Sequence, residues 1–298
     1  MSARPIPGID GKAATDLPVL KPFDPQGRAA HDPYMLTRMV ARLNAWHVLT
    51  LFAVIALWPA VAHAQSNYTY GEAFAALWKW IPFVVQQGFL FNILISFFAM
   101  AIGTAAGAIL GLMQISPSAF VRYPAAFITQ LFRNSPWLVL LFIVLLAFPF
   151  EIEIFGFIIP IPAWMKAVFG LSLPIMANIA EVVRGAVQSV PSGQWEASQS
   201  LGFSRRQTLW EIILPQCFKR MIPPWMNWYA ILTMATPLCS LLGVEEIVTL
   251  SRQAIEAEDN HPELLVPFFG FALLIFFAYC YPIARWTIAL ERRFAVKL

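Results

Sequence analysis

The residues of this chain that could do chemistry are gathered in one polar stretch between two apolar segments. The stretch runs from Gln194 to Gly202 and ends at Leu214 and Pro215. It carries carboxylate, guanidinium, amide, hydroxyl and indole groups, but no catalytic constellation such as clustered His and Asp accompanies it. A polar stretch set among apolar segments is suited to binding a soluble partner, so we expect recognition here rather than catalysis.

A second group of polar residues interrupts the apolar segments themselves. Ionisable side chains inside a membrane are costly and usually face a pore or a partner. Glu181 and Arg184 are spaced to pair on one helix, and a gate or substrate role is the alternative. Pro136 predicts a kink beside Arg133 and Asn134. The candidates for a gate or translocation path, each of which could equally hold helices together, are Asn92, Ser96, Arg133, Asn134, Glu181, Arg184, Asn227, Thr233, Thr236 and Pro237.

Metal and cofactor chemistry is not indicated by the remaining residues. The four histidines have no metal-ligand spacing. The three cysteines are expected to be buried small side chains rather than a disulfide framework. The chain also lacks a G-x-x-x-x-G-K-S/T loop, so it cannot supply a nucleotide site by itself. We therefore expect no metal and no cofactor on this chain.

The elements that must position these residues are apolar helices. The chain has 298 residues, 59% of them hydrophobic and 12% charged, whereas soluble domains carry about 25% charged residues. Runs of roughly 20 apolar residues are typical of membrane-spanning helices. The spans are expected near 45–62, 82–113, 124–149, 164–188, 222–244 and 264–289. The second and third are long enough to tilt or to extend past the bilayer.

Lys and Arg gather in alternate loops of this arrangement. They precede the first span, lie in the 190–220 loop and follow the last span, with Arg122 between the second and third spans. The intervening loops carry few of them. Because cytoplasmic loops collect Lys and Arg, both termini and the 190–220 loop are expected to be cytoplasmic. That requires an even number of spans, which agrees with the assignment above.

Composition divides the chain into three regions. Residues 1–34 are rich in Pro, Gly, Asp and Ala and are predicted to be a disordered cytoplasmic tail. Residues 35–64 are either an extra N-terminal transmembrane span or a signal peptide cleaved after Ala62-His63-Ala64. The long leader ahead of this segment favours the span. Residues 68–298 form the main membrane domain.

Two shorter segments of the main domain have patterns of their own. Residues 68–80 are rich in Tyr, Trp and Phe and precede a span, as in an aromatic belt at the membrane interface. Residues 246–258 place Ile247, Leu250 and Ala254 at helical spacing among charged residues. We expect a short amphipathic periplasmic helix there, packed on the bundle or presented to a periplasmic partner.

The polar stretch itself contains helix start and stop signals. Ser192 is expected to cap a helix that runs to Leu201, and Gly202 to end it in a left-handed conformation. Ser204 then starts a second helix, because Gln207 three residues later completes a capping box. Pro215 is expected to end the regular run. The prediction is two short helices joined by a glycine corner.

This loop resembles the EAA loop of ATP-binding cassette (ABC) importer permeases of type I. The resemblance lies in Glu196-Ala197, in Gly202 and in Ile212-Ile213-Leu214-Pro215, with Ser198 in place of a second alanine. Further segments resemble the polar amino-acid branch of that family and extend the likeness over residues 68–298. These segments are Phe132-Arg133-Asn134-Ser135-Pro136, Glu181-Val182-Val183-Arg184-Gly185, Pro223-Pro224, Asn227 and Leu241-Leu242-Gly243-Val244-Glu245.

The resemblance implies a fold, partners and a mechanism. The fold would be all-α and integral to the membrane, with a five-span core plus one extra N-terminal span. The partners would be a separate ATPase subunit that binds ATP and Mg, a periplasmic solute-binding protein, a second permease subunit and the lipid bilayer, with no nucleic acid. The location would be the bacterial inner membrane, and alternating access would import a small solute. The residues that couple to the ATPase would be Gln194, Trp195, Glu196, Ala197, Ser198, Leu201, Gly202, Phe203, Arg205, Leu214 and Pro215.

One departure from the family bears on the substrate. Many amino-acid permeases have Lys-Asp before Thr-Ser-Leu in the fifth span, where this chain has Met234-Ala235-Thr236-Pro237-Leu238. The acidic group that could meet a basic substrate is absent, so a basic amino acid is disfavoured. A neutral or acidic amino acid, an opine-like conjugate or another small organic solute stays open. A stand-alone secondary transporter is the remaining alternative, and it would need more membrane carboxylates than Glu181.

Overall fold

The computed structural model describes residues 50, 53, 68–154 and 156–294. The predicted tail at 1–34 and, apart from Thr50 and Ala53, the predicted extra span at 35–64 lie outside the described residues. The helices and strands named below belong to the unit from Asn67 to Leu298.

Three helical runs in the described part of the chain are long and apolar enough to cross a membrane. The first spans Tyr70–Gln114 and joins α3 (Tyr70–Phe83), the π-helical turn η1 (Val84–Phe89) and α4 (Leu90–Gln114). The second is α7 (Ala163–Gln188). The third comprises η4 (Pro262–Leu264) and α12 (Leu265–Phe294). Two further pairs of helices, each bent at a short break, raise the number of candidate spans to five if each pair crosses once.

The segment predicted as a span at 124–149 is a bent pair of helices rather than one continuous helix. Helix α5 (Ala119–Arg133) and helix α6 (Trp137–Ala147) meet at 104°. The bend lies at the expected proline: Pro136 adopts an extended conformation and begins α6. Proline has no N–H to continue a helix, and it disfavours helical geometry in the residue before it. The chain therefore bends by 104° at the place where a kink was expected.

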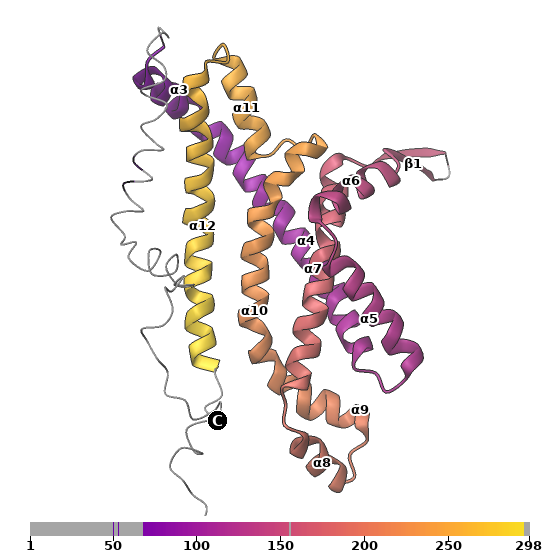
Figure 1. Cartoon of the computed structure of the whole chain (residues 1–298). Coiled ribbons are helices and arrows are strands. Elements are labelled where there is room, and N and C mark those ends of the chain that lie inside the picture. Colours follow the sequence, from indigo (N-terminus) through magenta and orange to yellow (C-terminus); the bar gives the residue numbers. More distant parts are fainter. Residues whose placement is uncertain (1–49, 51–52, 54–67, 155, 295–298) are drawn as a thin grey trace, which may run out of the picture. The chain divides into compact units, whose positions relative to one another are not determined.

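A small β-hairpin follows α6, which the sequence did not predict. Strand β1 (Glu151–Ile154) pairs antiparallel with β2 (Phe157–Pro160), with Glu151 opposite Pro160. Gly156 between them has φ +81°, a left-handed value that suits the tight turn. Figure 1 shows the hairpin extending away from the helices beyond α6.

The second bent pair begins in the polar loop. Helix α9 (Arg205–Gln207), the π-helical turn η2 (Thr208–Ile213), α10 (Leu214–Ala235) and the 3₁₀ turn η3 (Thr236–Leu242) form one run, which bends by 52° to α11 (Ile247–Ala257). The span expected at 222–244 is therefore the later part of a longer helix. Helices α10 and α12 lie side by side, joined by a 2.8 Å hydrogen bond between the hydroxyls of Tyr229 and Tyr279.

The core of the domain forms where α4 crosses α7 (Figure 1). Gly103, Gly107 and Gly111 recur every fourth residue along the contacting face of α4. A Cβ atom on Gly107 would lie 2.6 Å from the backbone oxygen of Met176 on α7. Small residues at this spacing let two helices approach closely, so packing between backbones replaces packing between side chains.

The predicted amphipathic helix at 246–258 is confirmed as α11. Ile247, Leu250 and Ala254 are buried, as the spacing predicted. The turn after α11 contacts α3: the Glu258 carboxylate accepts hydrogen bonds from Lys79 Nζ (2.7 Å) and Trp80 Nε1 (2.8 Å). These contacts attach α3 to the end of α11.

Candidate functional site

The polar loop begins with helix α8 (Ser192–Ser200). The predicted cap is wrong by one position: Pro191 is the N-cap, Ser192 is the first helical residue, and no side chain caps this end. Pro191 has φ −54° and ψ 139°, a non-helical conformation that separates α8 from α7. Ser198, buried on the inner face, donates to the Gln194 carbonyl at 2.7 Å.

The predicted glycine corner is confirmed. Gly202 has φ +84°, and nothing lies within 4 Å of the position that a Cβ atom would occupy. The amide of Phe203 donates to the Ser198 carbonyl at 3.1 Å, the bond expected when a left-handed residue closes a helix. The conformation of the backbone, rather than a lack of space, is therefore what favours glycine here.

The start of the second helix also matches the prediction. The Ser204 hydroxyl accepts from the Gln207 amide (3.4 Å), and Gln207 Oε1 accepts from the Ser204 amide (3.0 Å), which completes the capping box. The end of this helix was predicted wrongly, because Pro215 lies in the first turn of α10 and the helix continues to Ala235. The wide π-helical turn η2 immediately precedes this proline. The changed hydrogen-bond pattern of such a turn accommodates a proline, which has no backbone N–H to donate.

The loop is fixed to the membrane helices on one side. Ile213 and Cys217 are fully buried against Val187 and Val190 at the end of α7, with Trp195 of α8 packed on this cluster. Gln216 Nε2 on α10 donates to Gln194 Oε1 on α8 at 2.7 Å. Movement of α8 would therefore be passed to α7 and α10.

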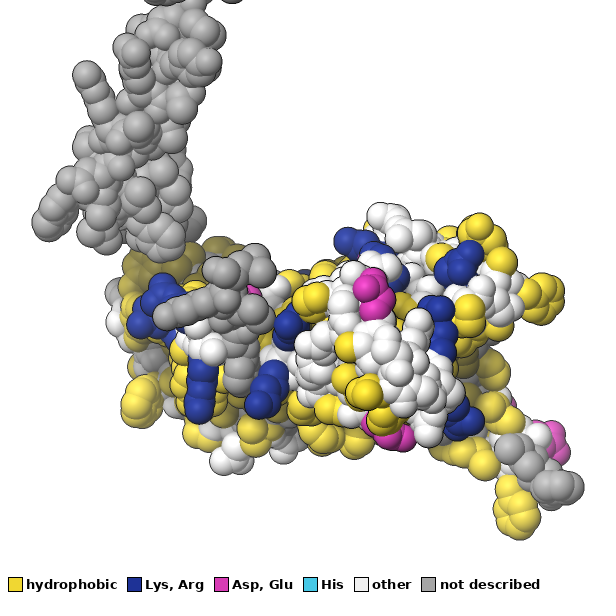
Figure 2. Space-filling view, turned by 90° about the horizontal axis from the view of Figure 1, so that it is seen from below, with side chains coloured by type: hydrophobic (Ala, Val, Ile, Leu, Met, Phe, Trp, Pro, Cys, Tyr) yellow, Lys and Arg dark blue, Asp and Glu magenta, His cyan; other side chains and the backbone are white. Residues whose placement is uncertain are grey.

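The other side of the loop is exposed. Figure 2 views the molecule from the end that carries α8 and α9 and shows hydrophobic side chains interspersed with Lys and Arg there. The Leu201 side chain is 77% exposed at the corner, and Trp210 is 55% exposed. Glu196, Ala197 and Arg205 are also exposed. An apolar corner with a charged surround is typical of a protein-binding surface.

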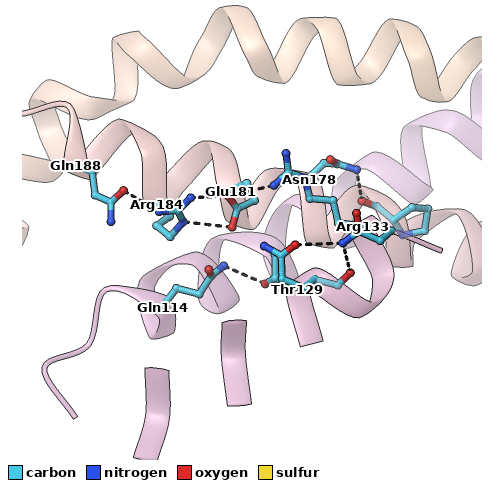
Figure 3. A network of polar contacts seen from close by, with 10 residues as sticks. Gln114, Thr129, Arg133, Asn178, Glu181, Arg184 and Gln188 are labelled. Carbon is cyan, nitrogen blue, oxygen red and sulfur yellow. Dashed lines mark hydrogen bonds and ion pairs between the residues drawn. The ribbon is translucent and has the colours of Figure 1, made fainter. Parts of the chain in front are cut away.

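The predicted pair of Glu181 and Arg184 is confirmed and belongs to a larger network (Figure 3). Arg184 Nη2 donates to Glu181 Oε2 at 2.6 Å and Nε to Oε1 at 3.2 Å. Arg184 Nη1 also donates to Gln188 at 2.7 Å. Arg133 Nη1, at the end of α5, lies 3.4 Å from Glu181 Oε2. The structure thus brings together two predicted sites that the sequence placed in separate spans.

This network borders one of two neighbouring cavities. The polar cavity, of about 410 Å³, is lined by Arg133, Asn178, Glu181 and Arg220 among others. The second cavity, of about 680 Å³, lies between α4, α7 and α10 and has almost wholly apolar walls. Val182 of α7 lines both, so the two cavities are adjacent.

Other predicted path residues make hydrogen bonds between elements of the fold. Asn92 is fully buried on α4, and its Nδ2 donates to Thr236 Oγ1 (2.9 Å) and to Glu246 Oε2 (3.0 Å). Its Oδ1 accepts from the Ile247 amide at 3.1 Å. Glu246, also fully buried, caps α11 by accepting from the Val248 and Thr249 amides. These bonds connect α4, η3 and α11.

Glu246 was missed by reasoning from the sequence. Its signal was an acidic residue directly ahead of the apolar periodicity of α11, at the N-cap position. Among the other predicted path residues, Ser96 and Thr233 are buried and bond to carbonyls of their own helices. Asn134 bonds to Gln130, Asn227 is exposed, and Pro237 lies in η3, where the α-helix tightens.

Residues 103–295 match the family model of the binding-protein-dependent transport system inner membrane component. The chain belongs to this family. The match includes the polar loop, the Glu181 network and both cavities. The structure is thus that of the inner membrane component of a transport system that works with a binding protein.

The permease relatives are similar over most of their length. The chain is 35% identical over 214 residues to the probable amino-acid ABC transporter permease protein YckA of Bacillus subtilis (strain 168), covering 72% of this chain and 90% of that one. It is 29% identical over 210 residues to the L-cystine transport system permease protein TcyB of the same organism, covering 70% and 86%. A solved structure, the crystal structure of an amino acid ABC transporter with histidines, superposes with a TM-score of 0.62 at 23% identity, covering 74% of this chain and 98% of that one.

These comparisons confirm the family that the EAA-like loop predicted, and with it the role of an ABC importer permease in the inner membrane. The role is that of a transport subunit rather than an enzyme. In the part of the chain that the structure describes, no group of His, Cys, Asp and Glu is arranged to hold a metal ion.

Proposed function

We propose that this permease imports a neutral or acidic amino acid, or a derivative of one, with ATP hydrolysed by a separate subunit. The observation that carries the proposal is the α8 corner: its outer side exposes Leu201, while its inner side packs on α7 and α10. A rigid element with one bound and one free side can transmit a movement from a partner to the spans. We propose the ATPase as the partner that moves this corner, and a second permease subunit as the other half of the membrane assembly.

The coupling loop would divide its tasks among its residues. Leu201 and Glu196 would contact the ATPase, since both are exposed near the corner. Gly202 and Phe203 would keep the corner closed, as the bond to Ser198 supports. Trp195, Leu214 and the neighbouring Pro215 would connect α8 to the spans. Arg205, with its guanidinium 5.9 Å from the Trp195 ring, would help hold α8.

The membrane topology that we propose has five core spans. The three long helical runs count once each, and the pairs α5 with α6 and α9–α10 with α11 each count as one. With the extra span expected at 35–64, both termini and the 190–220 loop would be cytoplasmic. The α11 helix and the hairpin would then be periplasmic, where the solute-binding protein docks.

The adjacent cavities support an amino acid as the solute. The polar cavity offers arginines for a carboxylate, and Glu181 could meet an ammonium group by exchanging its contact with Arg133. The apolar cavity beside it could receive an uncharged side chain. A basic side chain would find no second carboxylate among the residues that line either cavity. A neutral or acidic amino acid therefore fits better than a basic one.

An opine-like conjugate is the second candidate. The octopine transport system permease protein OccM of Rhizobium radiobacter is 29% identical to this chain over 227 residues. The combined volume of the two cavities would admit a solute larger than one amino acid.

The test is ATP hydrolysis by the permease reconstituted with its ATPase and its binding protein, across a panel of neutral, acidic and basic amino acids and opines. Stimulation by neutral or acidic amino acids supports the proposal, and stimulation by opines alone selects the second candidate. Stimulation by basic amino acids alone contradicts the role given to the cavities. Failure to assemble with any ATPase contradicts the role given to the α8 corner.

A further inference from the structure

A basic pocket lies beside the coupling loop, near the end of α7, where Gln188 connects it to the Glu181 network. It has a volume of about 1060 Å³ and is enclosed by the ends of α4 and α7, the start of α5 and the corner between α8 and α9. Arg122, Arg205 and Arg206 line it. Figure 2 shows the end of the molecule on which these elements lie and the Lys and Arg side chains gathered there.

Among the residues that the structure describes, none balances the positive charge of this pocket. No Asp or Glu is among the residues that line it. The ion pairs among the described residues are made by Lys79, Arg133 and Arg184, not by the pocket arginines. Arg122 Nη1 donates to the Ser116 carbonyl at 3.2 Å, and Arg205 faces the Trp195 ring. Neither contact neutralises a guanidinium, so the pocket attracts anions.

The inner wall of the pocket is apolar. Ile115, Val187, Trp195 and Leu209 line it, and they continue the buried cluster at the base of α8. A small inorganic anion would gain nothing from such a wall. An anionic amphiphile would use both the arginines and the apolar wall. Its charged group would contact the arginines, and its chain would lie on the apolar residues.

The pocket also lies at the edge of the apolar zone. Helices α4 and α7, which form its walls, are both candidate membrane spans, and the pocket is at their ends. Arginine forks bind phosphate oxygens in pairs, and basic pockets between transmembrane helices are suited to lipid head groups.

We propose that this pocket binds the phosphate of an anionic phospholipid, whose acyl chain covers the apolar wall. The lipid would contact α8 and α9 of the coupling loop together with α4, α5 and α7, and so it would fix the loop relative to the spans. The proposal goes beyond the import function, because lipid binding needs neither the ATPase nor a solute.

The experiment measures lipid retention by the purified full-length chain in detergent, using native mass spectrometry. Phosphatidylglycerol and phosphatidylcholine with the same acyl chains are titrated against the wild type and against the double variant Arg205→Gln/Arg206→Gln. The control is Lys219→Gln/Arg293→Gln, which removes the same charge from two exposed residues outside the pocket. A second test variant, Arg122→Gln, lies on α5, away from the coupling loop.

The expected result is tighter binding of phosphatidylglycerol than of phosphatidylcholine by the wild type. The affinity for phosphatidylglycerol should fall about tenfold in the Arg205→Gln/Arg206→Gln variant, since charge-assisted bonds are lost, and should stay at the wild-type value in the control. Arg122→Gln should show a loss in the same direction. Circular dichroism at the wild-type level establishes that a variant is folded.

Three outcomes overturn the proposal. Equal affinity for the two lipids in the wild type shows that the anionic head group is not recognised. If inorganic phosphate binds to the protein and neither lipid displaces it, the pocket belongs to a soluble anion. Normal lipid binding by the arginine variants, combined with loss of ATPase assembly, assigns the arginines to acidic residues of the partner protein.

Discussion

Arg133 Nη1, at the end of α5 just before the sharp turn at Pro136, lies 3.4 Å from Glu181 Oε2 on α7. Glu181 is therefore shared between a guanidinium on its own helix and one from another. The Glu181 side chain is 14% exposed, whereas those of Arg184 and Arg133 are 33% and 45% exposed. The carboxylate is the member of the network whose charge depends most on its partners.

Replacing that carboxylate should therefore cost more than replacing either arginine. We expect Glu181→Gln to lower the free energy of unfolding by about 1–2 kcal/mol, between the values for surface and buried pairs. Arg133→Gln should cost less, because Arg184 still pairs with the carboxylate. Thermal unfolding of the detergent-purified variants measures both. A larger loss for Arg133→Gln than for Glu181→Gln would reverse the roles given to the two residues.

The close approach of α4 to α7 makes a second prediction. Gly107→Ala would place a Cβ atom 2.6 Å from the Met176 carbonyl, which backbone movement alone can relieve. We expect a loss of about 1–3 kcal/mol in stability, the usual cost of overpacking. Gly185→Ala on α7 is the matched control, because nothing lies within 4 Å of its added methyl group. Alanine there should be neutral or slightly stabilising, and equal unfolding temperatures for the two variants would contradict the close packing of α4 on α7.

The corner at Gly202 should matter for coupling more than for folding. An alanine at φ +84° costs about 1–2 kcal/mol in backbone energy, and this cost falls on an exposed corner. We expect Gly202→Ala to insert and fold, yet to lose several-fold of the solute-stimulated ATP hydrolysis in the assembled importer. Gly193→Ala, on α8 with open space around it and no left-handed φ, is the control. Full stimulation in the Gly202 variant would remove the corner from the coupling mechanism.

How far the sequence determined these features depends on whether they are local. Gly202 and the Ser204 capping box were predicted because a corner and a cap depend on a few neighbouring residues. The pairing of Glu181 with Arg184 follows from their spacing on one helix. Helical periodicity likewise predicted the buried face of α11.

The features that were missed depend on contacts between distant segments. The contact of Arg133 with Glu181 depends on how α5 packs on α7, and the 104° bend between α5 and α6 is an angle that a single proline does not specify. Asn92 and Glu246 are 154 positions apart, so neither residue alone indicates the bond between them. Pro215 was predicted to end a helix, but the helix continues to Ala235. The π-helical turn before Pro215 accommodates a residue that has no backbone N–H to donate.

The contact between α3 and the end of α11 should depend on pH. Hydrogen bonds from Lys79 and then from Trp80 hold the pKa of Glu258 below its ordinary value of 4.5. A lowered pKa in the folded state means that the stabilisation is complete above 4.5 and is lost as the pH falls through the lowered value. Because the pair is near the surface, its contribution should be about 0.5 kcal/mol.

The measurement compares the thermal unfolding of the wild type and Glu258→Gln at pH 7 and at pH 3.5. The variant keeps an acceptor for Trp80 but has no charge for Lys79, so it should be less stable at pH 7. The difference should shrink as the pH falls below 4.5 and through the lowered pKa of Glu258, because the wild-type carboxylate takes up a proton there. Glu256→Gln, on an exposed part of α11, controls for the loss of a negative charge from this end of the molecule. A difference between wild type and Glu258→Gln that grows as the pH falls would mean that Lys79 does not stabilise the charged form of Glu258.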